Sequence, residues 1–395
     1  MTPRVVWVSG EVPDVSLGGG SIRQAHLLRA VAEATETHLI VAGNLRDDSL
    51  RDRLASVTSV EAEPVRRPES VLRRRAEDLG RALLDGRSPE VSESREVVAA
   101  LSPVLRDTLR TGDLVQVEHS GLAPLVSLRS ERTRWAITLH TIESERIAHR
   151  LALAPSPRHR WLLRREQAKA RANEAMVAAR YDAVWVTSPE DEEAFPGAAT
   201  RVPNGVDTTA FLPSPLPGAA EIVFTGTLDY LPNLDGLSWF CLEVMPAIRQ
   251  HVPTATFRIV GRRPVAEVRA LASSARGVQV EADVDDVRPF LESARVVVVP
   301  LRIGSGTRLK ALEAMASGRP VVGTSIGLAG LGVVGGLGAR VADRPEEFAG
   351  AVVEVLQDDA TAARLAEEGR RIAEAHAWSS IAPAFVEGLL RVAAG

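Results

Sequence analysis

The sequence has little of several features on which whole classes of protein depend. It holds a single cysteine, Cys241, in 395 residues, which excludes an internal disulfide framework and a zinc site built from several cysteines. Aromatic residues are only 4% of the chain, too few for the base-stacking surfaces of RNA- and single-strand-binding proteins. A formal net charge of −4 exerts no overall attraction on nucleic acid. We therefore expect no nucleic acid partner.

Long apolar runs are also missing from the sequence. The run at 5–8 ends at Ser9-Gly10-Glu11, which is strand length and far below the ~20 residues that cross a bilayer. No segment resembles a signal peptide, so we expect a cytoplasmic protein. Lysine is rare as well, because only Lys169 and Lys310 occur among 47 basic residues.

The chain does have a regular alternation of short apolar runs and amphipathic stretches, which predicts parallel, doubly wound sheets. The expected strands are 5–9, 37–42, 114–118, 135–140 and 183–187, then 221–225, 256–260, 278–281, 296–300, 320–324 and 339–342. The expected helices are 21–34, 233–250, 265–273, 287–293, 308–316, 345–356, 360–375 and 378–392.

A turn signal divides this alternation into two halves. Pro203-Asn-Gly-Val-Asp207 is followed by Pro213, Pro215 and Pro217, and such clusters mark loops. We expect an N-terminal domain at 1–206 and a C-terminal domain at 207–377. The last apolar helix, 378–395, can cap either half, and we assign it to the first.

Ligands of doubly wound sheets bind beyond the carboxyl ends of the strands, and a glycine run follows the first strand. Gly18-Gly19-Gly20-Ser21 would let backbone N–H groups approach an anion at a helix N-terminus, with Ser21 as the helix cap. A flexible turn before a capped helix is the alternative. The spacing is neither a dinucleotide fingerprint nor a P-loop.

A denser group of polar residues follows the strand that ends at Pro300. The segment Gly304-Ser-Gly-Thr-Arg-Leu-Lys-Ala-Leu-Glu313 places glycines, then Arg308 and Lys310, at the start of a helix, where a diphosphate can bind. Glu313 lies further along that helix, where its carboxylate can accept bonds from a ribose diol. In the alternative interpretation Thr307 is only a cap and Glu313 only a surface carboxylate.

The segment 306–322 resembles the donor-site segment of GT-B glycosyltransferases of the large family 4. Other segments resemble that family in the same order along the chain: Thr138-Leu-His140-Thr-Ile-Glu-Ser144, Val202–Asp207, Phe224-Thr-Gly-Thr-Leu-Asp-Tyr-Leu-Pro-Asn233 and Val260-Gly261. The resemblance implies an α/β protein with the GT-B fold, in which two doubly wound parallel-sheet (Rossmann-like) domains face a central cleft. It also implies a retaining, metal-independent transfer of a sugar from a nucleotide-diphosphate-sugar donor to an acceptor hydroxyl.

The resemblance assigns roles to individual residues. The expected catalytic residues are His140, Arg308 and Lys310. The expected donor-binding residues are Gly19, Gly20, Gly226, Thr227, Asn233, Gly304, Ser305, Gly306, Thr307 and Glu313. The nucleotide sugar is a co-substrate, so we expect no cofactor and no metal.

Two positions depart from the family's pattern. Many members carry a glutamate eight residues before the ribose-binding one, where this chain has Ser305, and a serine supplies no negative charge beside a developing oxocarbenium ion. Many members also have an Arg–Lys pair in the first loop of the second domain. This chain has Thr227, Asp229 and Asn233 there, so Lys310 and Arg308 would have to supply the positive charge.

Other features allow both a functional and a structural interpretation. Glu118 and His119 follow a predicted strand, where they can contact the acceptor or simply complete the core edge. Asp283 and Asp285 spell a metal-binding pattern but precede a helix that they can cap. The basic segment 158–180 is either a solvated helix or a weak peripheral contact with the inner membrane face.

The sequence leaves the nucleotide, the sugar and the acceptor open, and the acceptor can be a cell-envelope saccharide or a small-molecule glycoside. Three alternatives to transfer also remain. They are a GT-B epimerase or hydrolase of nucleotide sugars, a catalytically weak nucleotide-sugar-binding protein suggested by Ser305, and, least favoured, a nicotinamide oxidoreductase.

Overall fold

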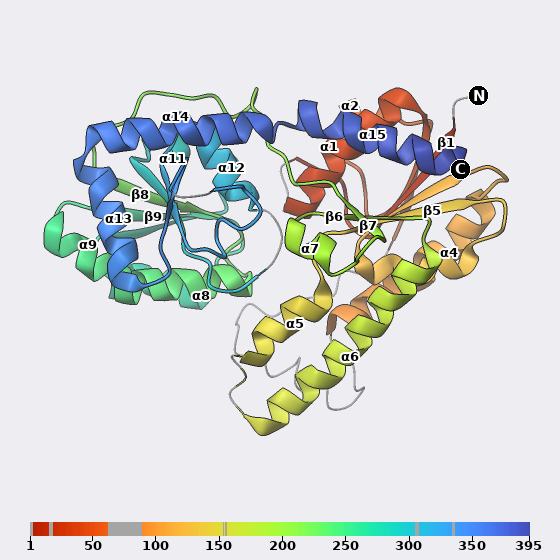
Figure 1. Ribbon diagram of the computed structural model, residues 1–395, viewed down its shortest axis with the longest axis horizontal. Coiled ribbons are helices and arrows are strands. Elements are labelled where there is room, and N and C mark those ends of the chain that lie inside the picture. Colours follow the sequence, from red (N-terminus) through yellow and green to blue (C-terminus); the bar gives the residue numbers. More distant parts are fainter. Residues whose placement is uncertain are drawn as a thin grey trace. The chain divides into compact units, whose positions relative to one another are not determined.

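The computed structural model describes residues 3–15, 19–61, 89–152, 154, 156–304, 308–333 and 336–395. These residues form two compact units. The first unit contains the described residues up to Pro203 together with Ser379–Gly395, and the second contains Asn204–Trp378. Each unit is built on one sheet, and all the strand pairs in both sheets are parallel (Figure 1). The prediction of two doubly wound parallel sheets is therefore confirmed.

The first sheet has seven strands in the order β3-β2-β1-β4-β5-β6-β7. The two edge strands, β3 and β7, were not expected from the sequence, because each is short or half polar and lacks a continuous apolar run. The strands are β1 (Arg4–Ser9), β2 (Glu36–Ala42), β3 (Ser56–Val60), β4 (Leu114–Glu118), β5 (Arg134–Leu139), β6 (Ala183–Val186) and β7 (Ala199–Arg201).

The second sheet has six strands in the order β10-β9-β8-β11-β12-β13. In each sheet the first strand of the unit lies centrally, and the chain then builds outward on one side before crossing to the other. The resulting switch points, between β1 and β4 and between β8 and β11, are where such sheets bind ligands. The strands are β8 (Glu221–Thr225), β9 (Thr256–Gly261), β10 (Val278–Ala282), β11 (Val296–Val299), β12 (Val321–Gly323) and β13 (Arg340–Val341).

Helices cover both faces of the first sheet. The ring of Trp7 on β1 packs edge-on against Phe385 in the last helix, with ring centroids 6.2 Å apart. Leu101, Val126 and Val177 cover the other face from three separate helical segments. The helices are α1 (Gly19–Ala34), α2 (Asp48–Arg51), α4 (Pro89–Thr108), η1 (Ser120–Leu128), α5 (Glu143–Ala152), α6 (Pro157–Arg180), α7 (Pro189–Glu193) and α15 (Trp378–Ala394).

The second sheet is also covered on both faces. One face packs on α8, η2, α9, α10 and α13, and the other on α11 and α12, while α14 contributes residues to both clusters (Figure 1). This alternation follows from strands such as β11, whose four residues are all fully buried valines, as a central parallel strand requires. The helices are α8 (Leu231–Trp239), η2 (Phe240–Val244), α9 (Met245–His251), α10 (Ala266–Ser274), α11 (Arg288–Ser293), α12 (Leu309–Ala316), α13 (Pro345–Gln357) and α14 (Asp359–Ala375).

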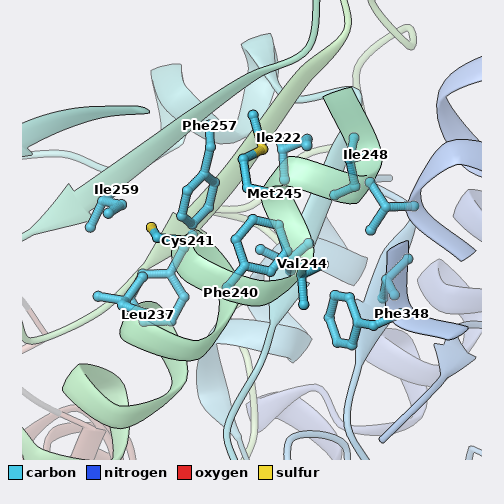
Figure 2. Close-up of a cluster of buried hydrophobic side chains, with 14 of the residues drawn as sticks. Ile222, Leu237, Phe240, Cys241, Val244, Met245, Ile248, Phe257, Ile259 and Phe348 are labelled. Carbon is cyan, nitrogen blue, oxygen red and sulfur yellow. The ribbon is translucent and has the colours of Figure 1, made fainter. Parts of the chain in front are cut away.

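The core of the second unit includes the chain's one cysteine. Figure 2 shows Cys241 among apolar side chains of the sheet and helices, close to the rings of Phe240 and Phe257, whose centroids are 4.5 Å apart. Cys241 is 1% exposed, and burial raises the pKa of its thiol to about 12. It is therefore an inert core residue, as its apolar sequence context predicts.

Two expected helix caps differ from the structure. The first helix begins at Gly19, so Ser21 lies in its first turn instead of capping it. At the start of α11 the backbone N–H of Arg288 donates to Asp286, 2.9 Å away. Asp283 instead accepts a 2.7 Å bond from the backbone N–H of Arg263. No helix in the described part of the chain is both long and apolar enough to span a bilayer.

Candidate functional site

At the switch point of the second sheet, a lysine ammonium lies against the loop that follows β8. Lys310 reaches back from the first turn of α12 and donates a 2.9 Å hydrogen bond to Asn233 Oδ1. Asn233 Nδ2 in turn donates to the carbonyl of Thr227 at 2.7 Å. The same ammonium lies 3.9 Å from the ring centroid of Phe224, which is the distance of a cation–π contact. Residues from β8, α8 and α12 thus hold one positive charge at the carboxyl ends of the central strands.

Two glycines make room for the cations at this edge. A Cβ at Gly226 would lie 2.6 Å from Lys310 Nζ, so any other residue would displace the ammonium. Gly304 has φ +121° and approaches the Arg308 guanidinium so closely that its Cβ would lie 2.9 Å from Nη2. The structure therefore needs glycine at both positions.

The N-terminus of α12 adds backbone donors to these cations. Arg308 occupies the cap position without a side-chain cap bond, and its Nε donates to the carbonyl of Ile326 at 3.3 Å. A helix start without a side-chain cap leaves N–H groups that suit an anion. A guanidinium, an ammonium and backbone N–H groups thus lie together at the carboxyl ends of the central strands. Groups of this kind can bind phosphate.

Lys310 and Glu313 lie one turn apart on α12 and are both half-buried. Burial and, to a smaller extent, the nearby Arg308 together lower the pKa of Lys310 to about 7, while Glu313 opposes the change. Burial also raises the pKa of Glu313 to about 7, against the effect of Lys310. Neither charged group is well solvated, so an anionic ligand that pairs with Lys310 would stabilise the charged form of the lysine.

We expect Lys310 to titrate near pH 7 in the free protein. The chain has only two lysines, so a protein labelled with ¹³C at lysine Cε gives two signals, which Lys310→Met and Lys169→Arg assign by their loss. Asn233→Asp should raise the pKa of Lys310, because it places an opposite charge on the ammonium. If Lys310 titrated with a pKa near 10, the burial attributed to this site would be wrong.

The corresponding edge of the first sheet carries a histidine held by a carboxylate. His140 follows β5, and its Nε2 lies 2.8 Å from Oε2 of Glu118 at the end of β4. The His119 ring stacks on that of His140, with centroids 5.0 Å apart. A Cβ at Gly20 would lie 3.7 Å from His140 Nδ1, which is ordinary contact, so the first unit itself does not demand glycine there.

The structure places some expected site residues differently from the sequence analysis. Gly19 and Gly20 form the first turn of α1, where their N–H groups are helix-terminal donors, and are not a loop before it. Glu118 is 1% exposed, so it contacts His140 and its strand neighbours and does not lie open to an acceptor. Ser305, Gly306 and Thr307 lie outside the described residues.

Sequence reasoning missed several residues of these two groups. Phe224 was assigned only to a strand. It lies two residues before Gly226, and its ring contacts the Lys310 ammonium. Gln116 lies two positions before the expected Glu118 in the otherwise apolar strand β4. Arg23 is fully buried in α1, where burial lowers its pKa to about 10 and Glu118 counteracts the change. A buried polar residue within an apolar pattern was the signal that could have identified Gln116 and Arg23.

Two other predicted features show no ligand site. Asp283 accepts a hydrogen bond from the backbone N–H of Arg263. The described residues hold no group of three potential metal ligands. The basic segment 158–180 forms α6, where Trp161 is 54% exposed and Arg165 stacks over its ring at 4.8 Å. A membrane contact through this helix stays a prediction.

The sequence matches known proteins most clearly over the second unit. Residues 219–358 match the sequence model of the family "Glycosyl transferases group 1". Glycogen synthase of Mycobacterium tuberculosis is 29% identical over 217 residues, 51% of this chain and 50% of that protein. A phosphatidyl-myo-inositol mannosyltransferase of Mycolicibacterium smegmatis is 26% identical over 199 residues, 48% of this chain and 51% of that protein. The matches thus span about half the length of these curated relatives.

Solved structures resemble the whole chain. Sucrose-phosphate synthase from Thermosynechococcus elongatus superposes with a TM-score of 0.75 at 19% identity, covering 99% of both chains. Anabaena HepE, solved with UDP and glucose, gives a TM-score of 0.67 at 15% identity, covering 98% of this chain and 99% of that one. At these identities the likeness shows the fold. Over residues 219–358 the chain is thus similar in sequence to the group 1 glycosyl transferases, and it has the GT-B fold.

Proposed function

We propose that the protein transfers a sugar from a nucleotide-diphosphate-sugar donor to an acceptor hydroxyl, with retained anomeric configuration and without a metal. The observation that carries this proposal is the half-buried ammonium of Lys310, fixed by Asn233 and Phe224 at the switch point of the second sheet. Among the residues that the structure describes, the hydrogen bond of this ammonium goes to an amide oxygen and not to a carboxylate, which suits it to an anionic ligand. The family match of residues 219–358 supports a nucleotide sugar as that ligand.

The chemistry needs charge stabilisation more than acid–base groups. Breaking the bond between the anomeric carbon and the diphosphate oxygen leaves negative charge on the phosphate. Lys310, Arg308 and the N–H groups of α12 would stabilise that charge, and preorganised donors of this kind are usually the largest catalytic contribution. The acceptor oxygen bonds to the anomeric carbon, and its proton passes to the departing phosphate oxygen on the same face.

The remaining expected residues bind the donor or orient the sugar. The Glu313 carboxylate accepts hydrogen bonds from the ribose hydroxyls, while Gly226, Thr227 and Asn233 shape the loop that holds Lys310. In the first unit, His140 bonds a sugar hydroxyl. The roles of Gly19, Gly20, Ser305, Gly306 and Thr307 in contacting phosphate and sugar stay predictions.

Thermal shift with UDP-, GDP-, ADP- and dTDP-sugars tests the donor class. A true donor should raise Tm with its concentration, because binding to the folded state stabilises it. UDP-glucose is the first probe, since HepE, a fold relative, was solved with it. Lys310→Met should show a smaller Tm shift at each donor concentration, whereas Lys169→Met on the exposed face of α6 should show the wild-type shift. If none of the four classes shifted Tm, the proposal would fail.

Turnover then separates transfer from its alternatives. With a bound donor and an added acceptor, transfer gives nucleoside diphosphate and a glycoside whose anomeric configuration is read by NMR. A hydrolase releases free sugar without acceptor, and an epimerase returns an isomerised donor. A binding protein gives a Tm shift but no nucleoside diphosphate with any saccharide or small-molecule acceptor, and that result would contradict the enzymatic proposal.

A further inference from the structure

The carboxylate of Glu118 lies at the centre of a buried hydrogen-bond network in the first sheet. Its Oε1 accepts bonds from Gln116 Nε2 at 3.0 Å and from Thr138 Oγ1 at 2.9 Å, while its Oε2 lies 2.8 Å from His140 Nε2. Glu118 and Thr138 are register partners on the neighbouring strands β4 and β5. The pairing of the two strands therefore sets the position of the carboxylate and hence of the imidazole.

The network also fixes which way the Gln116 amide points. Trp185 Nε1, which can only donate, lies 3.1 Å from Gln116 Oε1. The amide oxygen is therefore turned towards Trp185, and the amide NH₂ group is turned towards Glu118. The two hydrogen bonds that Oε1 of Glu118 accepts from Gln116 and Thr138 both come from donors, as an ionised carboxylate requires.

These contacts determine the tautomer of His140. An ionised carboxylate only accepts hydrogen bonds, so the imidazole must donate from Nε2. In the neutral ring this leaves Nδ1 as an acceptor. Nδ1 is the nitrogen nearest the first turn of α1, since a Cβ at Gly20 would lie 3.7 Å from it. The stacked ring of His119 restricts the rotation of the His140 ring.

We propose that Glu118 is a positioning residue that holds His140 as the Nε2–H tautomer and so presents Nδ1 as a hydrogen-bond acceptor to a sugar hydroxyl. The inference rests on the proposed function for the identity of the hydroxyl, but the tautomer is a property of the free protein. Burial of a carboxylate reduces the free energy of unfolding. An apolar residue at this position of a central strand would avoid that cost. Glu118 is nevertheless 1% exposed, and its Oε2 lies against His140 Nε2.

The variant Glu118→Gln tests the proposal. Glutamine fills the same volume, but its amide can accept from Nε2–H or donate to Nε2, so it no longer selects one tautomer. Long-range ¹H–¹⁵N spectra of the imidazole, assigned by loss of the signal in His140→Asn, should show Nε2–H in the wild type and both tautomers in Glu118→Gln. We expect kcat to fall by about 10- to 100-fold, as for other residues that orient a functional histidine, with KM for the donor within about threefold.

The chain supplies a matched control on the same sheet. His38 Nε2 lies 2.9 Å from Glu36 Oε1 on β2, and this pair lies at the surface. Glu36→Gln should change neither the His140 spectrum nor kcat. If Glu118→Gln lowered Tm too far for these measurements, Glu118→Asp would replace it. Aspartate keeps the charge but withdraws it from Nε2, so the same mixture of tautomers and a smaller fall in kcat are expected.

The outcomes separate this inference from the proposed function. A single Nε2–H tautomer in the variant, or a kcat within threefold of the wild type, would overturn the role of Glu118. Absence of turnover by the wild type with every donor would overturn the proposed function. In that case the spectra would still decide whether Glu118 sets the tautomer of His140.

Discussion

Replacing Lys310 with methionine should lower kcat by about 100-fold or more. Methionine keeps an unbranched, apolar side chain against the ring of Phe224 but removes the ammonium that lies 3.9 Å from the ring centroid. The departing diphosphate would then develop its charge without this donor, and loss of one preorganised donor costs about 100- to 1,000-fold in other enzymes. The measurement is nucleoside diphosphate release at saturating donor.

The control for this variant is Lys169→Met, which removes the chain's other lysine. Lys169 lies on α6 of the first unit, whereas the β8 loop belongs to the second, so kcat should be unchanged. Lys310→Met should not lower Tm. Burial lowers the pKa of Lys310 to about 7, so the charged ammonium is less favourable in the folded than in the unfolded chain, and its removal should not destabilise the fold. Turnover within about threefold of the wild type would contradict the assignment of Lys310 to the leaving group.

Replacing Glu313 with glutamine should weaken donor binding by about 10- to 150-fold, since a hydrogen bond to a charged group contributes about 1.5–3 kcal/mol. The loss should disappear when the donor lacks its ribose hydroxyls, because the variant and the wild type then make the same contacts. Calorimetry with a nucleotide sugar and its 2′,3′-dideoxy form completes this double-mutant cycle. Glu354→Gln, which alters a surface pair with Arg340, is the control and should leave the dissociation constant unchanged.

The pH dependence of binding separates Glu313 from Lys310. The pKa of Glu313 is raised to about 7, so the accepting carboxylate is lost as pH falls through 7. The pKa of Lys310 is lowered to about 7, so the ammonium is lost as pH rises through 7. Donor affinity should therefore be greatest near pH 7. Glu313→Gln should retain only the fall above pH 7, and Lys310→Met only the fall below it. An affinity independent of pH from 5 to 9 would contradict both roles.

Most of the fold could be predicted from the sequence because parallel central strands are buried on both faces. Runs such as Val296–Val299 are apolar throughout and stand out from the amphipathic helices between them. The edge strands β3 and β7 could not be recognised, since one of their sides has no neighbouring strand and their residues are half exposed. The helix expected at 233–250 forms, but η2 interrupts it with one wider turn.

The candidate site could be predicted only in part. The order of residues along 304–313 indicated an anion site, because glycines and cations there follow a buried strand directly. The sequence could not show that Asn233, far earlier in the chain, bonds Lys310, or that Glu118 lies behind His140. Both contacts depend on strand order and register, which bring distant residues together.

The central claim is that the ammonium of Lys310 receives the diphosphate of a nucleotide sugar. Its most direct test is to titrate the ¹³C-labelled lysines of the full chain with and without saturating nucleotide sugar. An anion beside Lys310 should raise its pKa by at least one unit above the value near 7 of the free protein, and the Lys169 signal should not respond. A Lys310 titration unchanged by a donor that binds would contradict the claim.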